Sequence, residues 1–218
     1  MEAKTIKGIR YLLNEETLTA EVIQKKGYSG DIVIPEIVVS KKVSYKVVGI
    51  DAETFKDSNI TSITIPDGVT TIGENAFRYC KSLTSINIPD GVTTIESNTF
   101  EDCSSLTSIT IPDSVTTIGD SAFNSCSSLT SITIPNSVTT IERSAFDGCS
   151  SLTSITLPDS VTTIGSCAFK DCESLVDIRY NGTIEQWNKI KFYTDLGDEW
   201  NKGVPTTIAH CINGDVEI

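Results

Sequence analysis

Cysteine is the residue type in this chain that is most able to do chemistry, and its spacing is regular. Five of the seven cysteines recur at intervals of 23 residues. Zinc would need CxxC pairs or several histidines, and the chain has neither. Side chains stacked at one repeat position are poorly aimed for a disulfide, whose dihedral angle must lie near about 90°. We therefore predict a column of buried, reduced thiols that fill the core: Cys80, Cys103, Cys126, Cys149 and Cys172. Cys167 and Cys211 lie outside this column.

A second column of side chains that could bind a ligand follows the prolines. Its members are Asp67, Asp90, Asp113, Asn136 and Asp159. Stacked carboxylates could hold calcium, but Asn136 interrupts the column and no unit contains a D-x-D pair. Asp and Asn at these positions also suit turns, where they hydrogen-bond to their own backbone. We expect turn residues here, and neither a metal nor another cofactor.

Catalytic groups do not converge anywhere in the sequence. A triad or an acid/base pair needs unlike residues at one place, whereas repeated units place the same residue along a line. The only histidine, His210, has no identifiable partner, and we expect it to be a satisfied residue of a cap strand. The sequence therefore favours a protein that is not an enzyme.

The elements that position these residues repeat with the same period. Proline recurs at 66, 89, 112, 135 and 158, and phenylalanine at 77, 100, 123, 146 and 169. The units at 106–128 and 129–151 differ at only five positions. A fixed period in this range predicts a solenoid, in which each unit buries its apolar face against its neighbours.

One unit shows the expected path of the chain. Ile132 and Ile134 alternate with polar residues, which predicts a strand with one wet face, and Pro135 ends it. Residues 138–141 then return along the opposite side. Phe146 and Cys149 follow at a spacing that lets both point inward, and we expect a single helical or 3₁₀ turn there.

The resulting pattern, L-x-x-I-x-I-P-x-x-V-x-x-I-x-x-x-A-F-x-x-C-x-x, resembles the BspA-like class of leucine-rich repeats. The resemblance covers residues 60–174, with Thr99 in place of the usual alanine. It implies a mostly β, right-handed leucine-rich-repeat solenoid with short helical turns, a parallel sheet on the concave face and a cap at each end. Many proteins of this class are exposed on bacterial or protozoan surfaces.

The segments before and after the regular repeats indicate how the chain divides into caps and repeats. We expect an N-terminal cap at 1–31, with two strands within 9–23 joined by a turn, and a degenerate first repeat at 32–59 that contains an inserted hairpin at 36–49. Five regular repeats occupy 60–174, and the last strand and C-terminal cap occupy 175–218. In that cap, Thr183–Gln186 is a capping-box sequence that begins a short helix, and Asn213-Gly214 is a hairpin signal. Trp187 and Trp200 are expected in the cap core.

Charge narrows the classes of partner. The formal net charge is −12, and residues 60–174 carry thirteen acidic against four basic groups, whereas residues 1–59 carry nine of each. An acidic array repels phosphate, which disfavours nucleic acid and anionic membrane surfaces. No apolar stretch is long enough to insert in a bilayer. We expect a monomer.

No signal segment follows Met1, so we expect either a cytoplasmic protein or a secreted or cell-surface protein whose export signal is missing from this sequence.

The remaining candidate site is the wet face of the predicted sheet. Small hydroxyl side chains dominate it, with a charged pair at its end, and its members are Ser62, Thr64, Ser85, Asn87, Ser108, Thr110, Ser131, Thr133, Ser154, Thr156, Asp177 and Arg179. Additional contacts are expected from the basic insertion, at Lys41, Lys42, Tyr45 and Lys46.

Rungs at the usual strand spacing of about 4.8 Å would form a regular lattice of hydroxyls. We predict a binding or adhesion module that recognises a protein or a glycan through this face. Two alternatives remain open. The array could be a passive spacer within a surface protein, with threonine chosen for its β propensity, or it could bind an ice or mineral lattice.

Overall fold

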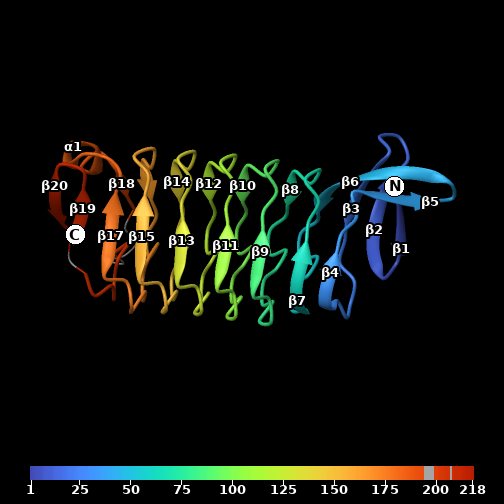
Figure 1. The fold of residues 1–218 in the computed structure, drawn as a ribbon, viewed down its shortest axis with the longest axis horizontal. Coiled ribbons are helices and arrows are strands. Elements are labelled where there is room, and N and C mark those ends of the chain that lie inside the picture. The colour runs from blue at the N-terminus through green and yellow to red at the C-terminus, as the bar shows by residue number, and fades with distance from the viewer. Residues whose placement is uncertain (194–198, 207) are drawn as a thin grey trace.

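The molecule is a row of stacked coils, closed at both ends by different structures (Figure 1). The computed structural model describes residues 1–193, 199–206 and 208–218. Each 23-residue unit forms one coil, with a strand on one side, a second, shorter strand on the other, and a chain of turns between them. The predicted solenoid fold, mostly β, is confirmed.

The first side of the stack, which we call the front sheet, carries one parallel strand from each coil. Pro135 and its equivalents end these strands because proline supplies no N–H to a ladder. Pairing joins β4 to β7, β9 to β11, and β13 to β15, β17 and β19, and Figure 1 shows the strands side by side. Their bounds are β4 Ser29–Val33, β7 Asn59–Thr64, β9 Ser85–Asn87, β11 Ser108–Thr110, β13 Ser131–Thr133, β15 Ser154–Leu157, β17 Asp177–Tyr180 and β19 Ile208–Cys211.

The opposite side, which we call the return sheet, is a second parallel ladder of short strands. The strands β10, β12, β14, β16 and β18 pair in that order, and β8 pairs with β6. In each regular strand the isoleucine is buried and the preceding threonine faces outward. Their bounds are β6 Val43–Ile50, β8 Thr71–Ile72, β10 Thr94–Ile95, β12 Thr117–Ile118, β14 Thr140–Ile141, β16 Thr163–Ile164 and β18 Lys191–Phe192.

The sequence predicts a single helical or 3₁₀ turn around each phenylalanine, and the structure has turns there with hydrogen bonds of the 3₁₀ type that do not continue as a helix. The N–H of Cys149 donates to the carbonyl of Phe146 at 3.2 Å, as in a 3₁₀ turn, but the N–H of Phe146 donates to Ala168 of the next coil at 2.8 Å. Ser144 and Gly148 have φ values of 50° and 73°. These left-handed residues interrupt any helix and aim alternate N–H groups at the neighbouring coil.

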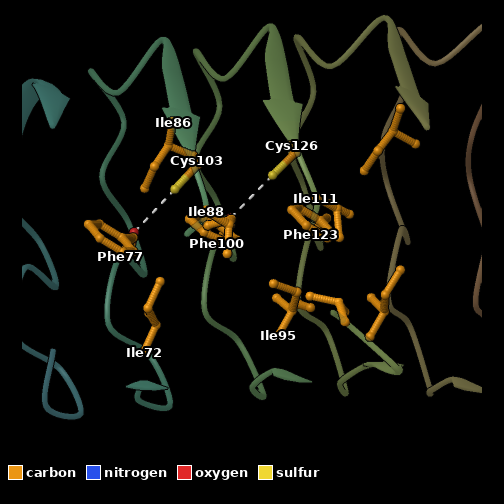
Figure 2. Close-up of a cluster of buried hydrophobic side chains, with 14 of the residues drawn as sticks. Ile72, Phe77, Ile86, Ile88, Ile95, Phe100, Cys103, Ile111, Phe123 and Cys126 are labelled. Carbon is orange, nitrogen blue, oxygen red and sulfur yellow. Dashed lines mark hydrogen bonds between the residues drawn. The ribbon is translucent and has the colours of Figure 1, made fainter. Parts of the chain in front are cut away.

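The core is a continuous stack that runs through every coil. Phenylalanine rings of successive coils lie 5.3–5.4 Å apart between centroids and are almost parallel, with interplanar angles of 2–9°. The stack begins at Tyr28 and ends at Trp200, which meets Phe169 edge-on at 6.0 Å. Figure 2 shows the stack with the isoleucines of both sheets packed around it. Aromatic contacts of this kind contribute beyond the area they bury.

The N-terminal cap is an antiparallel meander that the sequence predicts only in part. Strands β2 (Ile9–Asn14) and β3 (Thr19–Val22) pair as expected, and β1 (Glu2–Ile6) adds a third strand that was not predicted. Tyr11 and Leu13 of β2 are buried. The meander thus covers apolar side chains of the first coil, as a terminal repeat must be covered.

The segment inserted in the first coil folds as a hairpin. Strand β5 (Ile37–Ser40) pairs antiparallel with β6, and β6 pairs with β3. The two residues of its turn, Lys41 and Lys42, both have positive φ, 50° and 70°, as a type I′ hairpin turn requires. The hairpin lies beyond the first coil at the N-terminal end of the row (Figure 1).

The C-terminal cap contains the one helix of the described residues, α1 (Ile184–Trp187). The predicted capping box is confirmed, because Thr183 and Gln186 bond to each other's backbone N–H groups. The predicted hairpin is confirmed, but its turn lies one residue earlier than predicted, at 212–213, because Gly214 already pairs with Cys211 at the start of β20 (Gly214–Glu217). Both tryptophans are buried, as expected. Residues 194–198 and 207 of the predicted tail lie outside the described residues.

Burial of the stack generates a stability prediction. Phe123 is fully buried in a central coil, so Phe123→Ala should lower the free energy of unfolding by about 3–5 kcal/mol. Thr133→Ala, on the exposed side of β13, should cost about 1 kcal/mol or less. Urea denaturation followed by circular dichroism measures both. Equal midpoints for the two variants would contradict the assignment of the buried and exposed faces.

Candidate functional site

The predicted binding residues lie together on the outer surface of the front sheet, which we call the front face. Pairing places Ser131 beside Ser154 and Thr133 beside Thr156, so side chains of one type form straight columns. Ile132 and Ile155 between them point inward and are buried. All of the predicted front-face residues are exposed or half-buried.

Many hydroxyl groups on the surface of the array already have a structural task. Thr107 donates to the carbonyl of Thr84 in the preceding coil at 3.2 Å, and Thr162 donates to Thr139 in the same way at 3.2 Å. Turn serines do likewise, as Ser137 bonds to the carbonyl of Val115 at 2.5 Å. These side chains tie one coil to the next. Their abundance is therefore explained without a ligand.

The front-face hydroxyls differ from these. Within the described residues, no hydrogen bond inside the protein uses the side chains of Thr64, Ser85, Asn87, Ser108, Thr110, Ser131, Thr133, Ser154 or Thr156. Each can therefore donate to and accept from an outside partner. The structure thus separates hydroxyls that hold the array together from those left available at its surface.

Side chains of other types extend the front-face columns at both ends. Asp31 lies beside Ser62 and accepts hydrogen bonds from Ser62 at 2.6 Å and Thr61 at 2.8 Å. These two bonds lower the pKa of the Asp31 carboxyl below its ordinary value. Sequence reasoning missed Asp31, although aligning Ile32 with Ile63 would have found it.

At the other end, Arg179 binds Asp177 through two nitrogens, with Nε and Nη2 both 2.9 Å from Oδ2. His210 lies beside Arg179 in the ladder and contacts Asp215 through Nδ1 at 2.8 Å. The expectation of a partnered histidine in a cap strand is confirmed. The sequence did not show that His210 shares the front face with Arg179.

The lysine hairpin corrects one predicted contact residue. Tyr45 is 3% exposed and belongs to the core, because alternation along β6 turns it inward together with Val47. Lys41, Lys42 and Lys46 are exposed. Lys41 pairs with Glu2 at 3.2 Å. The hairpin therefore offers lysines, without the aromatic ring, at the extreme N-terminal end.

The cysteine column lies inside the coils. Each thiol donates to the carbonyl of a phenylalanine in the preceding coil, as Cys103 does to Phe77 at 3.1 Å (Figure 2). Burial raises the pKa of the Cys80 thiol to about 11 and that of Cys172 to about 12. All seven cysteines are reduced. Neutral, enclosed thiols are poor nucleophiles, so this column is structural.

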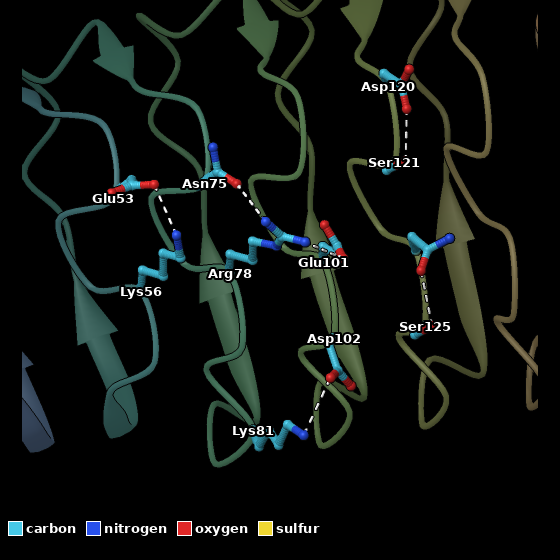
Figure 3. Close-up of polar contacts among 11 residues, drawn as sticks. Glu53, Lys56, Asn75, Arg78, Lys81, Glu101, Asp102, Asp120, Ser121 and Ser125 are labelled. Atoms are coloured by element: carbon cyan, nitrogen blue, oxygen red, sulfur yellow. Dashed lines mark hydrogen bonds and ion pairs between the residues drawn. The ribbon is translucent and has the colours of Figure 1, made fainter.

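Charged side chains at the phenylalanine turns also join neighbouring coils (Figure 3). Arg78 contacts Glu101 at 2.8 Å, and Lys81 contacts Asp102 at 3.2 Å. The Arg78–Glu101 pair is half-buried and Lys81 is exposed; ion pairs that water still reaches contribute little stability, about 0–1 kcal/mol. We assign them no part in a binding site.

The aspartate column that follows the prolines is exposed at the turns between the two sheets. In the part of the chain that the structure describes, no group of three or more His, Cys, Asp or Glu side chains is placed to hold a metal ion. Across the same residues, no helix has the length and apolar character needed to cross a membrane.

Comparison with protein families supports the resemblance that the sequence indicates. A profile described as a BspA type leucine rich repeat region matches residues 48–176 and 116–196, with six copies. No curated protein gives a significant match.

Several solved structures are similar along most of the chain. A leucine-rich cell surface protein from Faecalibacterium prausnitzii is 32% identical, with a TM-score of 0.63 over 83% of this chain and 55% of that one. A leucine-rich repeat protein from T. pallidum is 26% identical, with a TM-score of 0.74 over 92% and 91%. One from Bacteroides ovatus is 26% identical, with a TM-score of 0.65 over 96% and 71%. The chain thus spans about half the length of the Faecalibacterium protein.

The buried thiols generate a reactivity prediction. Cys126 and Cys149 are fully buried, and burial raises the pKa of both thiols well above the ordinary value. A water-soluble thiol reagent at neutral pH should label the half-buried Cys211 first and the column only after unfolding. Mass spectrometry of timed samples with and without denaturant measures this order. Rapid labelling of the column in the folded protein would refute the assignment.

The carboxyl of Asp31 generates a pH prediction. Its folded-state pKa is lowered, so its hydrogen bonds favour the folded protein above the ordinary Asp pKa, and that contribution is lost as the pH falls through the lowered value. Ser62→Ala should move the pKa of Asp31 upward, because Ser62 is the largest cause of the shift. NMR titration of the side-chain carboxyl measures this, with Ser85→Ala as the control. An ordinary pKa for Asp31 in the unaltered protein would contradict it.

Proposed function

The chain belongs to the family of BspA-type leucine-rich repeat proteins, and from this premise we propose that it is a non-enzymatic binding module. Its front face, from Ser62 and Thr64 to Asp177 and Arg179, would contact a protein or a glycan. The observation that carries this proposal is the set of exposed front-face hydroxyls without partners inside the protein.

The geometry supports this use of the front face over other surfaces. Successive strands place equivalent hydroxyls side by side, and the small side chains let a partner approach the sheet closely. A ligand with its own repeat, such as a glycan chain, would meet the same donors and acceptors at every coil. This is how solenoids present an extended surface for binding.

The affinity for a ligand would come from the same contact repeated on successive coils. One hydroxyl contact contributes on the order of 0.5–1.5 kcal/mol, which is too little for a stable complex by itself. Contacts along several coils act together once the first has formed. The charged ends, Asp31 on one side and Asp177 with Arg179 on the other, would fix the register and direction of the bound chain.

The cell surface is the proposed location. The similar Faecalibacterium protein is described as a cell surface protein. An acidic array with exposed hydroxyls is suited to water on all sides. Within a longer surface protein, the array would hold its front face open to molecules outside the cell.

A passive spacer is the second candidate, and one observation favours it. The units at 106–128 and 129–151 are nearly identical, and a monotonous surface is poorly suited to one irregular protein epitope. In that case the front face would have no ligand, and any binding would belong to the ends.

A double substitution separates these two functions. Thr110→Lys with Thr133→Lys places bulky charge at the centre of the front face and leaves the core unchanged. Binding of the labelled protein to a glycan array and to an array of extracellular proteins should fall at least tenfold. The matched control is Thr94→Lys with Thr117→Lys, which makes the same change at two neighbouring positions on the return sheet and should keep the signal.

Both variants should melt within a few degrees of the unaltered protein. Undiminished binding by the folded front-face variant would refute the front face as the site. It would favour the spacer function for the array and place recognition in its loops or caps.

A further inference from the structure

The front sheet begins with a strand that has a neighbour on one side only. Strand β4 pairs with β7, and no other strand of the described residues pairs with it. The N–H of Ile34 donates to Thr64 of β7 at 3.0 Å. Because backbone groups alternate in direction along a strand, the N–H and C=O groups of Asp31 and Val33 point away from β7. Strand β4 therefore has an open edge with backbone donors and acceptors.

A groove follows this edge, between β4 and the turn that joins β1 to β2, and we call it the edge groove. It consists of two hollows of about 420 and 430 Å³, whose linings share Lys7, Ile9 and Val33. Asp31, on the front face, and Ile32, which packs against the core, both line it. Since residues from both faces of β4 line the groove, it lies at the edge of the strand. Figure 1 shows β1 and β2 beyond β4 at the N-terminal end of the row.

Much of the edge groove is apolar and open to water. Val33, Ile37 and Val39 line it and are 66%, 54% and 56% exposed. Ile6 and Ile9 belong to the opposite wall. Residues 44–175, all of which the structure describes, have no large hydrophobic side chain that is exposed. Exposed apolar side chains gathered along one groove indicate a surface that a partner covers.

Two other edge strands of the fold carry charges instead. Strand β1 has Glu2 and Lys4, which pair at 2.9 Å, and β20 has Asp215 and Glu217. Charged side chains protect an edge strand from pairing with another chain. Strand β4 has an apolar residue, Val33, at the corresponding place on its open edge.

The charged groups of the edge groove favour an acidic partner. Lys7 and Lys25 line the groove, and Lys25 donates to the carbonyl of Gly8 at 2.7 Å, which holds its ammonium group at the wall. The carboxylate of the lining, Asp31, already accepts two hydrogen bonds from hydroxyls of β7. The lining thus has two cations against one carboxylate.

We propose that the edge groove binds an extended, acidic and apolar peptide, which adds to β4 as a further strand of the front sheet. Main-chain hydrogen bonds to Asp31 and Val33 would hold the peptide, and its alternate side chains would give the specificity. Apolar side chains of the peptide contact Ile9 and Ile37, and a carboxylate reaches Lys7. A basic peptide would bring like charges together. This site uses none of the front-face hydroxyls and does not depend on the proposed function.

Two synthetic peptides serve as probes. They are the fluorescein-labelled amide of Glu-Val-Thr-Val-Thr-Ile and the same residues in reverse order, because parallel and antiparallel addition place the carboxylate differently. Fluorescence anisotropy should show that at least one of them binds the folded protein. Replacing its Glu by Lys should weaken binding at least fivefold.

Variants of the protein locate the bound peptide. Val33→Pro removes one N–H from the open edge and no bond to β7, so it should weaken binding at least tenfold. The matched control is Val33→Thr, which keeps that N–H, resembles the neighbouring Thr64 and should bind within about threefold. Lys7→Glu should weaken binding at least fivefold. The front-face variant with Thr110→Lys and Thr133→Lys should bind as the unaltered protein does.

N-methylation of the peptide tests the hydrogen bonds directly. Only every second residue of a strand faces β4, so methylating the backbone nitrogens of either the two valines or the two threonines should abolish binding, and methylating the other pair should not. In the unaltered protein, NMR hydrogen exchange should show the Val33 amide exchanging freely and becoming protected when the probe is bound. This measurement does not depend on the folding of any variant, and circular dichroism checks the variants themselves.

Several results would overturn the proposal. They are the absence of binding by both probes at millimolar concentration, equal binding by Val33→Pro and Val33→Thr, an unprotected Val33 amide in the complex, and full binding by both N-methylated peptides. Loss of binding in the front-face variant would place the peptide on the front face instead. A dimer in sedimentation velocity that Val33→Pro dissociates would assign the edge groove to a second copy of the chain.

Discussion

Each coil of this protein satisfies its backbone on the coils beside it, and the close spacing that results governs every other feature. The N–H of Phe146 bonds to Ala168 of the next coil, while its ring stacks on Phe169 at 5.3 Å. The thiol of Cys172 reaches back to the Phe146 carbonyl at 3.1 Å. The hydrogen bonds and the side-chain packing therefore favour the same distance between successive coils. No single coil can form its core alone.

The spacing between coils also determines which side chains the surface presents to a ligand. Any side chain placed on one coil is repeated on the next at almost the same height, so the surface consists of columns. Several hydroxyl columns join coils, as Thr107 joins its coil to the carbonyl of Thr84. The front-face column that includes Thr133 has no such task. A ligand bound by the array itself would meet the same side chains on every coil. The surface becomes specific where a column changes residue type, as it does at Asp31 or at His210.

The two caps end the stack by different means. At the N-terminal end, Tyr28 tilts against Phe55 at 4.8 Å and the meander covers the first coil. At the C-terminal end, Trp200 closes the stack edge-on against Phe169. Both caps contribute strands to the sheets that they close, and this continuity brings irregular residues such as His210 into line with the repeated ones. Each cap thus covers one end of the core and also adds side chains of other types to the surface of the sheets.

The sequence by itself determined the period, the strand that ends at each proline, the inward Ile, Phe and Cys positions and the wet Ser/Thr face, because these follow from local alternation and from repetition. Tertiary structure alone decided which hydroxyls join coils, that Ser144 in the phenylalanine turn adopts a left-handed conformation, and that Tyr45 points inward. It also placed Asp31 and His210 in columns of the front sheet. The physical reason is that hydrogen-bond partners and column neighbours belong to the adjacent coil, and the distance to that coil is set by packing rather than by any local preference of the chain.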